Sequence, residues 1–159
     1  VLSRGNALHK LIEDYLNNED IDLLSVSPVV SSLFVQMKDT LDKIDNIQAL
    51  EMPLWSNTLA LAGRVDCVAE YDGKLSIIDF NGSTRQKREE DIENYYLQGT
   101  AYAIMWHERT GVPIREFNII VANENGTACQ VFSGNPTKYV PSLYKMIKKY
   151  HEKNPALLV

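Results

Sequence analysis

The sequence predicts an α/β (α+β) domain in which a central mixed β-sheet is flanked by helices. Apolar residues recur with a helical period near both ends of the chain and in one long central segment. Between these segments lie short apolar runs bounded by turn residues, which is typical of strands. The chain has 159 residues, of which 45% are hydrophobic and 23% charged. This length and composition fit a single domain over 1–159 with a hydrophobic core.

Two helices are predicted before the first strand. Apolar residues from Asn6 to Leu16 fall on one helical face. A second helix should begin after Ser27, which suits an N-cap, with Pro28 as its first residue. The expected buried stripe of this second helix consists of Val30, Leu33, Phe34, Met37, Leu41 and Ile44.

The apolar period then changes to that of strands. Three strands are expected over 49–55, 59–71 and 74–80, with Asp72-Gly73 as a tight turn between the last two. The predicted order is completed by a helix over 88–110, strands over 114–122 and 127–132, and a terminal helix that opens at Asn135-Pro136. This order of elements predicts helices packed on a sheet.

The bulk properties exclude few classes of function. A net charge of −5 announces no polyanion partner, although local patches rather than totals attract phosphates. Cys67 and Cys129 are single and far apart, which favours buried free thiols in a reducing compartment. The sequence contains no long apolar span, signal-like start or lipidation motif. A soluble intracellular protein with no membrane partner is therefore expected.

Two carboxylates occupy positions that are normally apolar in strands. Asp66 lies within Gly63–Ala69, and Asp79 ends the run Leu75–Asp79. Counted outward from the Asp72-Gly73 turn, the two residues come out almost opposite one another, at the ~5 Å spacing of a cross-strand pair. Close, partly buried carboxylates repel each other, and a hard divalent cation removes that repulsion. The alternative is that each aspartate serves only a local salt bridge or strand end.

At this point the motifs resemble a known family. The segments Gly63-Arg64-Val65-Asp66 and Ile77-Ile78-Asp79-Phe80, followed by Ser83, are similar to the central motifs of RecB-like PD-(D/E)XK nucleases, the phage and mitochondrial genome-maintenance exonucleases among them. The segment Arg4–Lys10 resembles the family's N-terminal helix with its histidine. The pair Gln98 and Tyr102 resembles its Gln-x-x-x-Tyr motif, and the likeness runs from about Arg4 to Val121.

The resemblance implies a restriction-endonuclease-like core and a role for each matching residue. Asp66 and Asp79 would bind Mg²⁺ or Mn²⁺, with the backbone carbonyl of Phe80 as a further ligand. His9 would be a ligand or a close neighbour of the ion, although an ordinary histidine on an amphipathic helix is the alternative. Glu51 matches an acidic position on the first strand and is expected to be a structural or supporting carboxylate.

The long helix contributes the last two residues of the implied site. Gln98 and Tyr102 are four residues apart and share one face of the helix. They would contact the DNA backbone or brace the site, and a purely structural helix face remains open for both.

The sequence departs from the family motif two residues after Asp79. A lysine is expected there to position the attacking water or to stabilise the charge of the transition state, whereas this chain has Asn81. Asparagine keeps a hydrogen-bond donor but brings no positive charge, so transition-state electrostatics should weaken. Three explanations remain open: an inactivated or altered variant, a divergent enzyme that uses another cation, and a domain that binds but no longer cleaves.

The densest basic segment follows the second carboxylate. Ser83, Arg85, Lys87 and Arg88 are expected to bind phosphates beside the site, with a solvated loop as the alternative.

The leading hypothesis is a metal-dependent exonuclease that acts on single-stranded DNA or free ends in replication, recombination or repair. The expected location is the cytoplasm of a phage-infected cell or the mitochondrial matrix. A catalytically silent nucleic-acid-binding module, and an unrelated α/β interaction protein, are the competing hypotheses.

Overall fold

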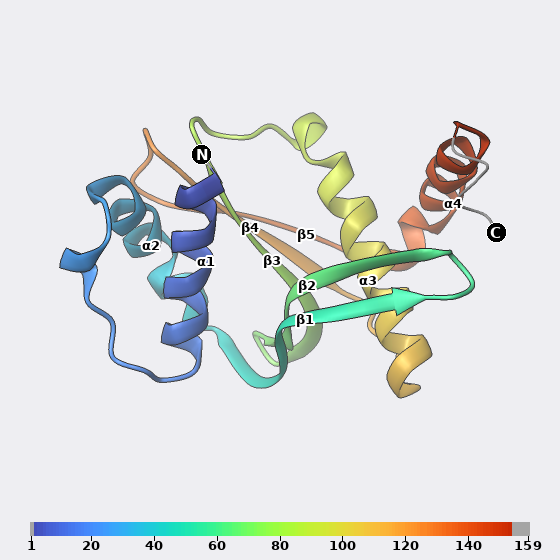
Figure 1. The fold of residues 1–159 in the computed structure, drawn as a ribbon, viewed down its shortest axis with the longest axis horizontal. Coiled ribbons are helices and arrows are strands. Elements are labelled where there is room, and N and C mark those ends of the chain that lie inside the picture. The colour runs from blue at the N-terminus through green and yellow to red at the C-terminus, as the bar shows by residue number, and fades with distance from the viewer. Residues whose placement is uncertain (1, 154–159) are drawn as a thin grey trace.

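A computed structural model describes residues 2–153 of the chain, with side chains from Gly5 onward. The elements in chain order are α1 (Leu2–Leu16), η1 (Leu23–Ser25), α2 (Pro28–Leu41), β1 (Ile44–Ser56), β2 (Leu61–Tyr71), β3 (Lys74–Ser83), η2 (Glu89–Asp91), α3 (Glu93–Thr110), β4 (Phe117–Asn123), β5 (Gln130–Gly134) and α4 (Pro136–Lys153). Figure 1 shows the sheet in the middle of the molecule, with α1 and α2 to one side and α3 and α4 to the other.

The described strands form one five-stranded sheet in the order β1-β2-β3-β4-β5. Strands β1, β2 and β3 pair in antiparallel fashion, as do β4 and β5, whereas β3 and β4 are parallel. Helix α3 connects the parallel pair, because a crossover between parallel strands needs a connection of this length. The predicted mixed sheet with flanking helices is confirmed.

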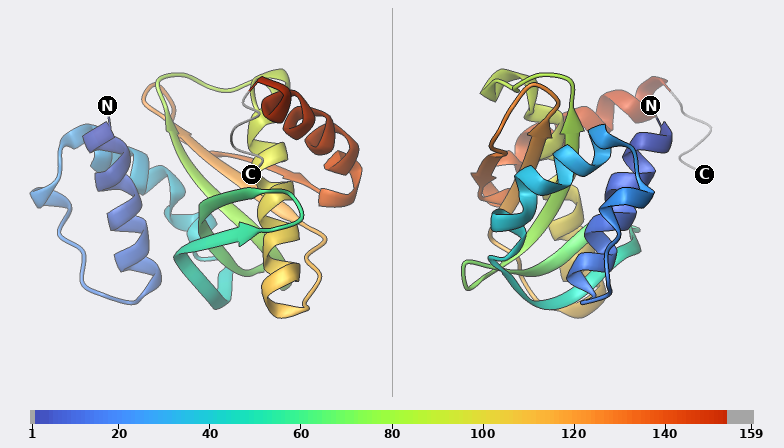
Figure 2. Two further views of the ribbon diagram at one scale, coloured as in Figure 1. Left: turned by 45° about the vertical axis from the view of Figure 1, so that its right-hand side comes forward. Right: turned by 90° about the vertical axis from the view of Figure 1, so that its left-hand side faces the viewer.

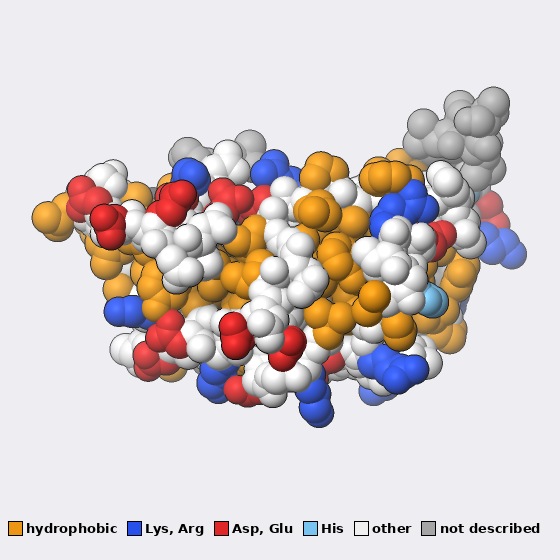
Figure 3. Space-filling model, turned by 90° about the horizontal axis from the view of Figure 1, so that it is seen from below, with side chains coloured by type: hydrophobic (Ala, Val, Ile, Leu, Met, Phe, Trp, Pro, Cys, Tyr) orange, Lys and Arg blue, Asp and Glu red, His pale blue; other side chains and the backbone are white. Residues whose placement is uncertain are grey.

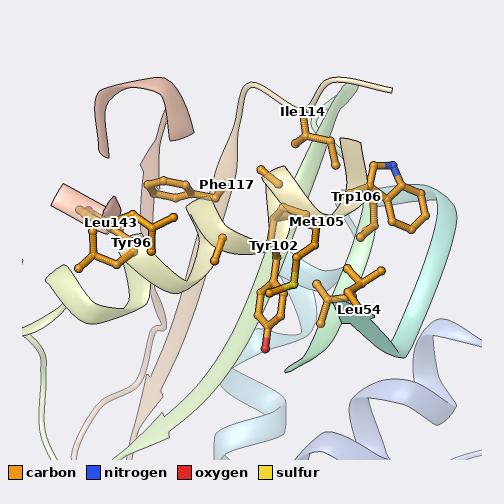
Figure 4. Close-up of a cluster of buried hydrophobic side chains, with 14 of the residues drawn as sticks. Leu54, Tyr96, Tyr102, Met105, Trp106, Ile114, Phe117 and Leu143 are labelled. Carbon is orange, nitrogen blue, oxygen red and sulfur yellow. The ribbon is translucent and has the colours of Figure 1, made fainter. Parts of the chain in front are cut away.

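Each face of the sheet has its own apolar core. The face covered by α1 and α2 buries side chains of both helices against Cys67, Ile78 and Ile120. The opposite face buries residues of α3 and α4 against Val68, Ile77 and other strand residues, and the two views in Figure 2 show helices on both sides of the sheet. Figure 4 shows part of this second core, in which Tyr96, Tyr102 and Trp106 of α3 lie together. The long helix therefore contributes its aromatic residues mainly to packing.

Local signals explain where several elements begin and end. The Ser27 hydroxyl accepts a hydrogen bond from the Val30 amide and caps α2. The turn between β2 and β3 has positive φ angles at Asp72 (50°) and Gly73 (84°), as expected of a two-residue hairpin turn. Helix α3 ends at Gly111, whose φ of 76° is left-handed. These features were predicted, and the structure confirms them.

Several predicted boundaries were wrong. Ile44 does not belong to the buried stripe of α2, because the helix ends at Leu41 and Ile44 begins β1. The helix expected from residue 88 begins at Glu93, because Arg88–Asp91 form a capped 3-10 turn and Ile92, with a φ of −115°, leaves the helical region while its side chain becomes buried. The strands expected over 114–122 and 127–132 begin later, at Phe117 and Gln130, because the parallel register with β3 starts at Phe117.

The two cysteines are free thiols. Cys67 is buried, as predicted, whereas Cys129 is half-buried and lies 3.2 Å from the Thr40 hydroxyl. Within residues 2–153, no helix combines the length and hydropathy needed to cross a bilayer. On the face drawn in Figure 3, acidic side chains are more frequent at the left end, which α1 and α2 form. Basic side chains are scattered over the whole face.

Candidate metal centre

The candidate site lies where β2 and β3 separate. The two strands pair from Tyr71–Lys74 to Cys67–Ile78, and the next rung would join Asp66 to Asp79. There the ladder stops, and the Asp66 carboxylate instead accepts a hydrogen bond from the Phe80 amide at 2.9 Å. The predicted opposition of the two aspartates is thus close to the observed register, and it falls at the point where the sheet opens.

Helix α1 brings His9 to this opening. Its Nε2 lies 2.8 Å from the Phe80 carbonyl oxygen and 3.8 Å from Asp66 Oδ2. The backbone of Phe80 is therefore held on both sides of its Cα, with the N–H hydrogen-bonded to Asp66 and the carbonyl to His9. The same packing that buries Leu8 and Ile12 against the sheet fixes the position of His9 between them.

Glu51 completes the cluster from β1. Its Oε1 lies 3.5 Å from His9 Nδ1, and donor atoms of His9, Glu51 and Asp66 all lie within 4.8 Å of one another. Glu51 has a φ of 48°, which is uncommon for a residue with a side chain of this size and costs on the order of 1 kcal/mol or more. This unusual backbone conformation lies at the residue whose carboxylate joins the cluster.

The cluster carries more negative charge than its surroundings compensate. Burial and, next, the neighbouring Asp79 together raise the pKa of Asp66 to about 9, while the hydrogen bond from the Phe80 amide opposes the change. Burial also raises the pKa of Glu51, and His9 and Arg64 oppose that shift. A divalent cation would replace the missing positive charge. Carboxylates, an imidazole and a backbone carbonyl together form a donor set that suits such an ion.

Asp79 and Asn81 interact with each other. Asn81 Nδ2 donates a hydrogen bond to Asp79 Oδ2 at 2.7 Å, so the side chain in the expected lysine position orients the carboxylate. Both side chains are half-buried. The amide satisfies one oxygen of Asp79 without adding positive charge to the site.

Gln98 and Tyr102 lie behind the cluster on α3. The Tyr102 hydroxyl accepts a hydrogen bond from the Arg64 amide at 3.2 Å, and the Gln98 side chain also hydrogen-bonds this hydroxyl. In Figure 4 the Tyr102 ring lies among the apolar core residues, and its hydroxyl points away from them. A Cβ on Gly63 would lie only 2.7 Å from that hydroxyl oxygen. The two motifs that were quoted separately from the sequence are therefore in direct contact.

The predicted phosphate-binding segment is held mainly by its own neighbours. The Ser83 hydroxyl and the Arg85 backbone form a local turn. The Lys87 backbone is bonded to the Gln130 side chain of β5. Arg88 is ion-paired with the acidic residues of η2. Of the four, Ser83 lines a pocket in whose wall His9 also lies.

His9 lies in the walls of two hollows. One is a cleft of about 180 Å³ lined by polar and charged residues, namely Asn6, His9, Lys10, Glu13, Glu51 and Arg64. The other is a pocket of about 300 Å³, mostly apolar, whose walls include Leu8, Leu33, Phe80 and Asn81. The charged cleft and the apolar pocket thus both border the cluster at His9.

The sequence underestimated Glu51 and did not single out Arg64. Glu51 was expected only as a supporting carboxylate, yet it is one of the three residues whose donor atoms converge. Arg64 was quoted as a motif residue, and its Nε lies 3.2 Å from Glu51 Oε2. Glu51 lies between Leu50 and Met52, so a charge within an apolar strand was a signal beside the match to an acidic position of the family.

Comparisons with known proteins show the family to which the chain belongs. A family model for the PD-(D/E)XK nuclease superfamily matches residues 24–153. Mitochondrial genome maintenance exonuclease 1 is 32% identical in Mus musculus over 105 residues and 30% identical in Homo sapiens over 88 residues. These matches cover 64% and 55% of the chain, and 30% and 26% of the two relatives.

A solved structure shares the fold. The crystal structure of a candidate exonuclease from Eubacterium rectale matches with a TM-score of 0.58 at 11% identity, covering 99% of this chain and 66% of that one. The chain spans less than a third of the length of the two curated relatives. The family model begins after α1 and so does not include His9, but it contains both aspartate strands. This chain belongs to the PD-(D/E)XK nuclease superfamily.

Proposed function

We propose that this chain is a metal-dependent exonuclease that hydrolyses phosphodiester bonds at the free ends of single-stranded DNA. The observation that carries the proposal is the convergence of His9, Glu51 and Asp66 where β2 and β3 separate, in a member of a nuclease superfamily. The names of the two curated relatives, which are exonucleases of mitochondrial genome maintenance, support DNA as the substrate. They also support a role in replication, recombination or repair.

The proposed metal is Mg²⁺ or Mn²⁺. Asp66, Asp79 and Glu51 would supply carboxylate oxygens, the Phe80 carbonyl a backbone oxygen, and His9 a ring nitrogen or a hydrogen bond to that carbonyl. When bound, such an ion activates water and neutralises charge on the scissile phosphate. Because Asp66 and His9 hold the backbone N–H and carbonyl of Phe80, this carbonyl is oriented before any ion arrives.

The two hollows beside His9 support an unpaired strand as the substrate. The charged cleft with Lys10 and Arg64 suits the phosphate backbone, because cations position phosphates without reading sequence. The apolar pocket with Leu33 and Phe80 offers a surface for a sugar or a base that has left its stack. A duplex would present neither of its bases to such a pocket without unpairing.

Cleavage of labelled DNA tests the proposal. The purified chain is incubated with a 5′-labelled single strand, the same sequence as a duplex, and a circular single strand without ends, each with Mg²⁺, with Mn²⁺ or with EDTA. We expect metal-dependent shortening of the linear single strand only. The Asp66→Asn variant is the matched inactive control, because it removes the charge and keeps the shape. Cleavage that persists in EDTA, or in Asp66→Asn, would refute the metal site.

A non-catalytic nucleic-acid-binding module is the second candidate. Asn81 favours it, because a neutral amide stands where the family motif has a lysine. This amide is hydrogen-bonded to Asp79. Under this reading, the chain binds single-stranded DNA but shortens it neither as it stands nor with Asn81→Lys. Cleavage gained only with Asn81→Lys would instead identify a disabled nuclease.

A further inference from the structure

We propose that Arg64 supplies to the scissile phosphate the positive charge that Asn81 cannot. The inference rests on the proposed nuclease function and adds a catalytic residue to it. Arg64 and Asp66 lie two residues apart on β2, so the cation and a metal-binding carboxylate would come from one strand. In the family motif, by comparison, the lysine comes from the strand of the second aspartate.

Contacts through Glu51 bring the Arg64 guanidinium to the edge of the cluster. Arg64 Nε lies 3.2 Å from Glu51 Oε2 and donates to the Glu51 carbonyl oxygen at 3.1 Å. The other carboxylate oxygen, Oε1, faces His9 at 3.5 Å. One oxygen of Glu51 thus faces the candidate ion site while the other holds the arginine, so both can be engaged together.

The backbone of Arg64 is fixed while its side chain stays accessible. Its amide is bonded to the buried Tyr102 hydroxyl, and Gly63 leaves the space that this hydroxyl needs. The side chain is 65% exposed and lines the charged cleft beside His9. A phosphate that enters the cleft would therefore meet a guanidinium whose point of attachment does not move.

Two other described cations, Lys10 and Arg88, form ion pairs away from the cluster. Lys10 lines the same cleft, but its ammonium is 3.0 Å from Asp14, one turn along α1 and away from the cluster. Arg88 is paired with Glu90 at 2.9 Å. The guanidinium of Arg64 is the one that contacts a carboxylate of the cluster itself, which is why we assign it the role.

The proposed step is hydrolysis, in which Arg64 transfers no proton. The oxygen of one water forms a bond to phosphorus, and the bond from phosphorus to the leaving sugar oxygen breaks with its electron pair. The water loses one proton to solvent, and the leaving oxygen gains one from solvent. Negative charge grows on the non-bridging oxygens, and a guanidinium, which remains protonated, donates two parallel hydrogen bonds to such oxygens.

A double-mutant cycle between positions 64 and 81 tests the assignment. The four proteins are the natural chain, Arg64→Gln, Asn81→Lys and the double variant, assayed on labelled single-stranded DNA with Mg²⁺. We expect Arg64→Gln to lower kcat by about 100-fold in the natural chain, the loss typical of one transition-state donor. In the Asn81→Lys background we expect the same change to cost far less, because the lysine supplies the charge.

Two measurements separate a catalytic role from a structural one. The rise in Tm on adding Mg²⁺ should be the same in Arg64→Gln as in the natural chain. Binding of a fluorescent single strand in EDTA should weaken no more than it does in Lys10→Gln, which removes a charge from the same cleft.

The possible outcomes separate this inference from the function beneath it. Equal losses for Arg64→Gln in both backgrounds would overturn the inference, because the two positions would then act independently. Cleavage by Asn81→Lys but not by the natural chain would also overturn it, while leaving the nuclease site intact. If none of the four proteins cleaves, the proposed function itself fails.

Discussion

Replacing Gly63 by alanine tests whether the Tyr102 hydroxyl determines the backbone position beside Arg64. The added Cβ would lie 2.7 Å from Tyr102 Oη and 3.1 Å from its Cε1. Tyr102 is only 8% exposed, so its ring is confined and either the ring or β2 must shift. Forcing an atom into a packed site of this kind costs about 1–3 kcal/mol. For a chain of this length, that is about 3 °C of Tm for each kcal/mol.

A second substitution separates the clash from other effects. Tyr102→Phe alone removes the acceptor of the Arg64 amide and should cost about 1–2 kcal/mol. It also removes the oxygen that the new Cβ at residue 63 would approach most closely. The double variant should therefore cost less than the sum of the two single variants, with a coupling of about 1–2 kcal/mol, as is usual for residues in contact.

Urea denaturation in EDTA, followed by circular dichroism, measures the four free energies of unfolding. Gly5→Ala is the control, because a Cβ there meets nothing within 4 Å and lies within α1. It should stabilise the chain by about 0.5–1 kcal/mol, the ordinary gain from glycine to alanine in a helix. The reasoning would be refuted if the losses of unfolding free energy for Gly63→Ala and Tyr102→Phe were additive. It would also be refuted if Gly63→Ala were as stable as its parent.

Three further predictions concern the cluster and α2. The raised pKa of Asp66 means that the folded chain keeps a proton that the unfolded chain releases, so metal-free stability should fall as pH rises from about 4 toward about 9; Asp66→Asn should flatten this slope in urea titrations, and an unchanged slope would contradict the assignment. Glu51→Gly should relieve the strain of the positive φ at residue 51, which is worth about 1 kcal/mol, so the Tm should stay the same or increase by a few degrees. The same variant should reduce the increase in Tm that Mg²⁺ causes. An undiminished increase would exclude Glu51 as a ligand. Ser27→Ala should cost about 1 kcal/mol by removing the cap on Val30, and Ser32→Ala, at an exposed position of the same helix, is the comparison.

The sequence predicted the sheet and the hairpin because both depend on local signals. The Asp72-Gly73 turn fixes which residues of β2 and β3 are opposite, so counting from it gives the register that the structure shows from Tyr71–Lys74 to Cys67–Ile78. The start of α3 was placed too early, because the charged run before Glu93 has ordinary helix propensity. What the sequence could not show is that burial of Ile92 turns the chain there.

The arrangement of the candidate site was less predictable, because it depends on contacts between distant elements. His9 and Phe80 are separated by 71 positions, and only the packing of α1 on the sheet determines that they meet. Glu51 joins the cluster through a left-handed backbone conformation, which no strand pattern predicts. Arg64 contacts Glu51 only because β1 and β2 pair in the register Pro53–Arg64.

The backbone of Phe80 offers a spectroscopic reporter of the site. Its amide is hydrogen-bonded to Asp66 and its carbonyl to His9, so the two peptide groups that flank this residue each contact a group that would bind an ion. Loading the site would draw electron density from Asp66 and weaken its hold on the amide proton. The nitrogen and proton resonances of Phe80 should therefore move on titration with Mg²⁺, even in a variant that cleaves nothing. Ion binding could then be followed separately from turnover.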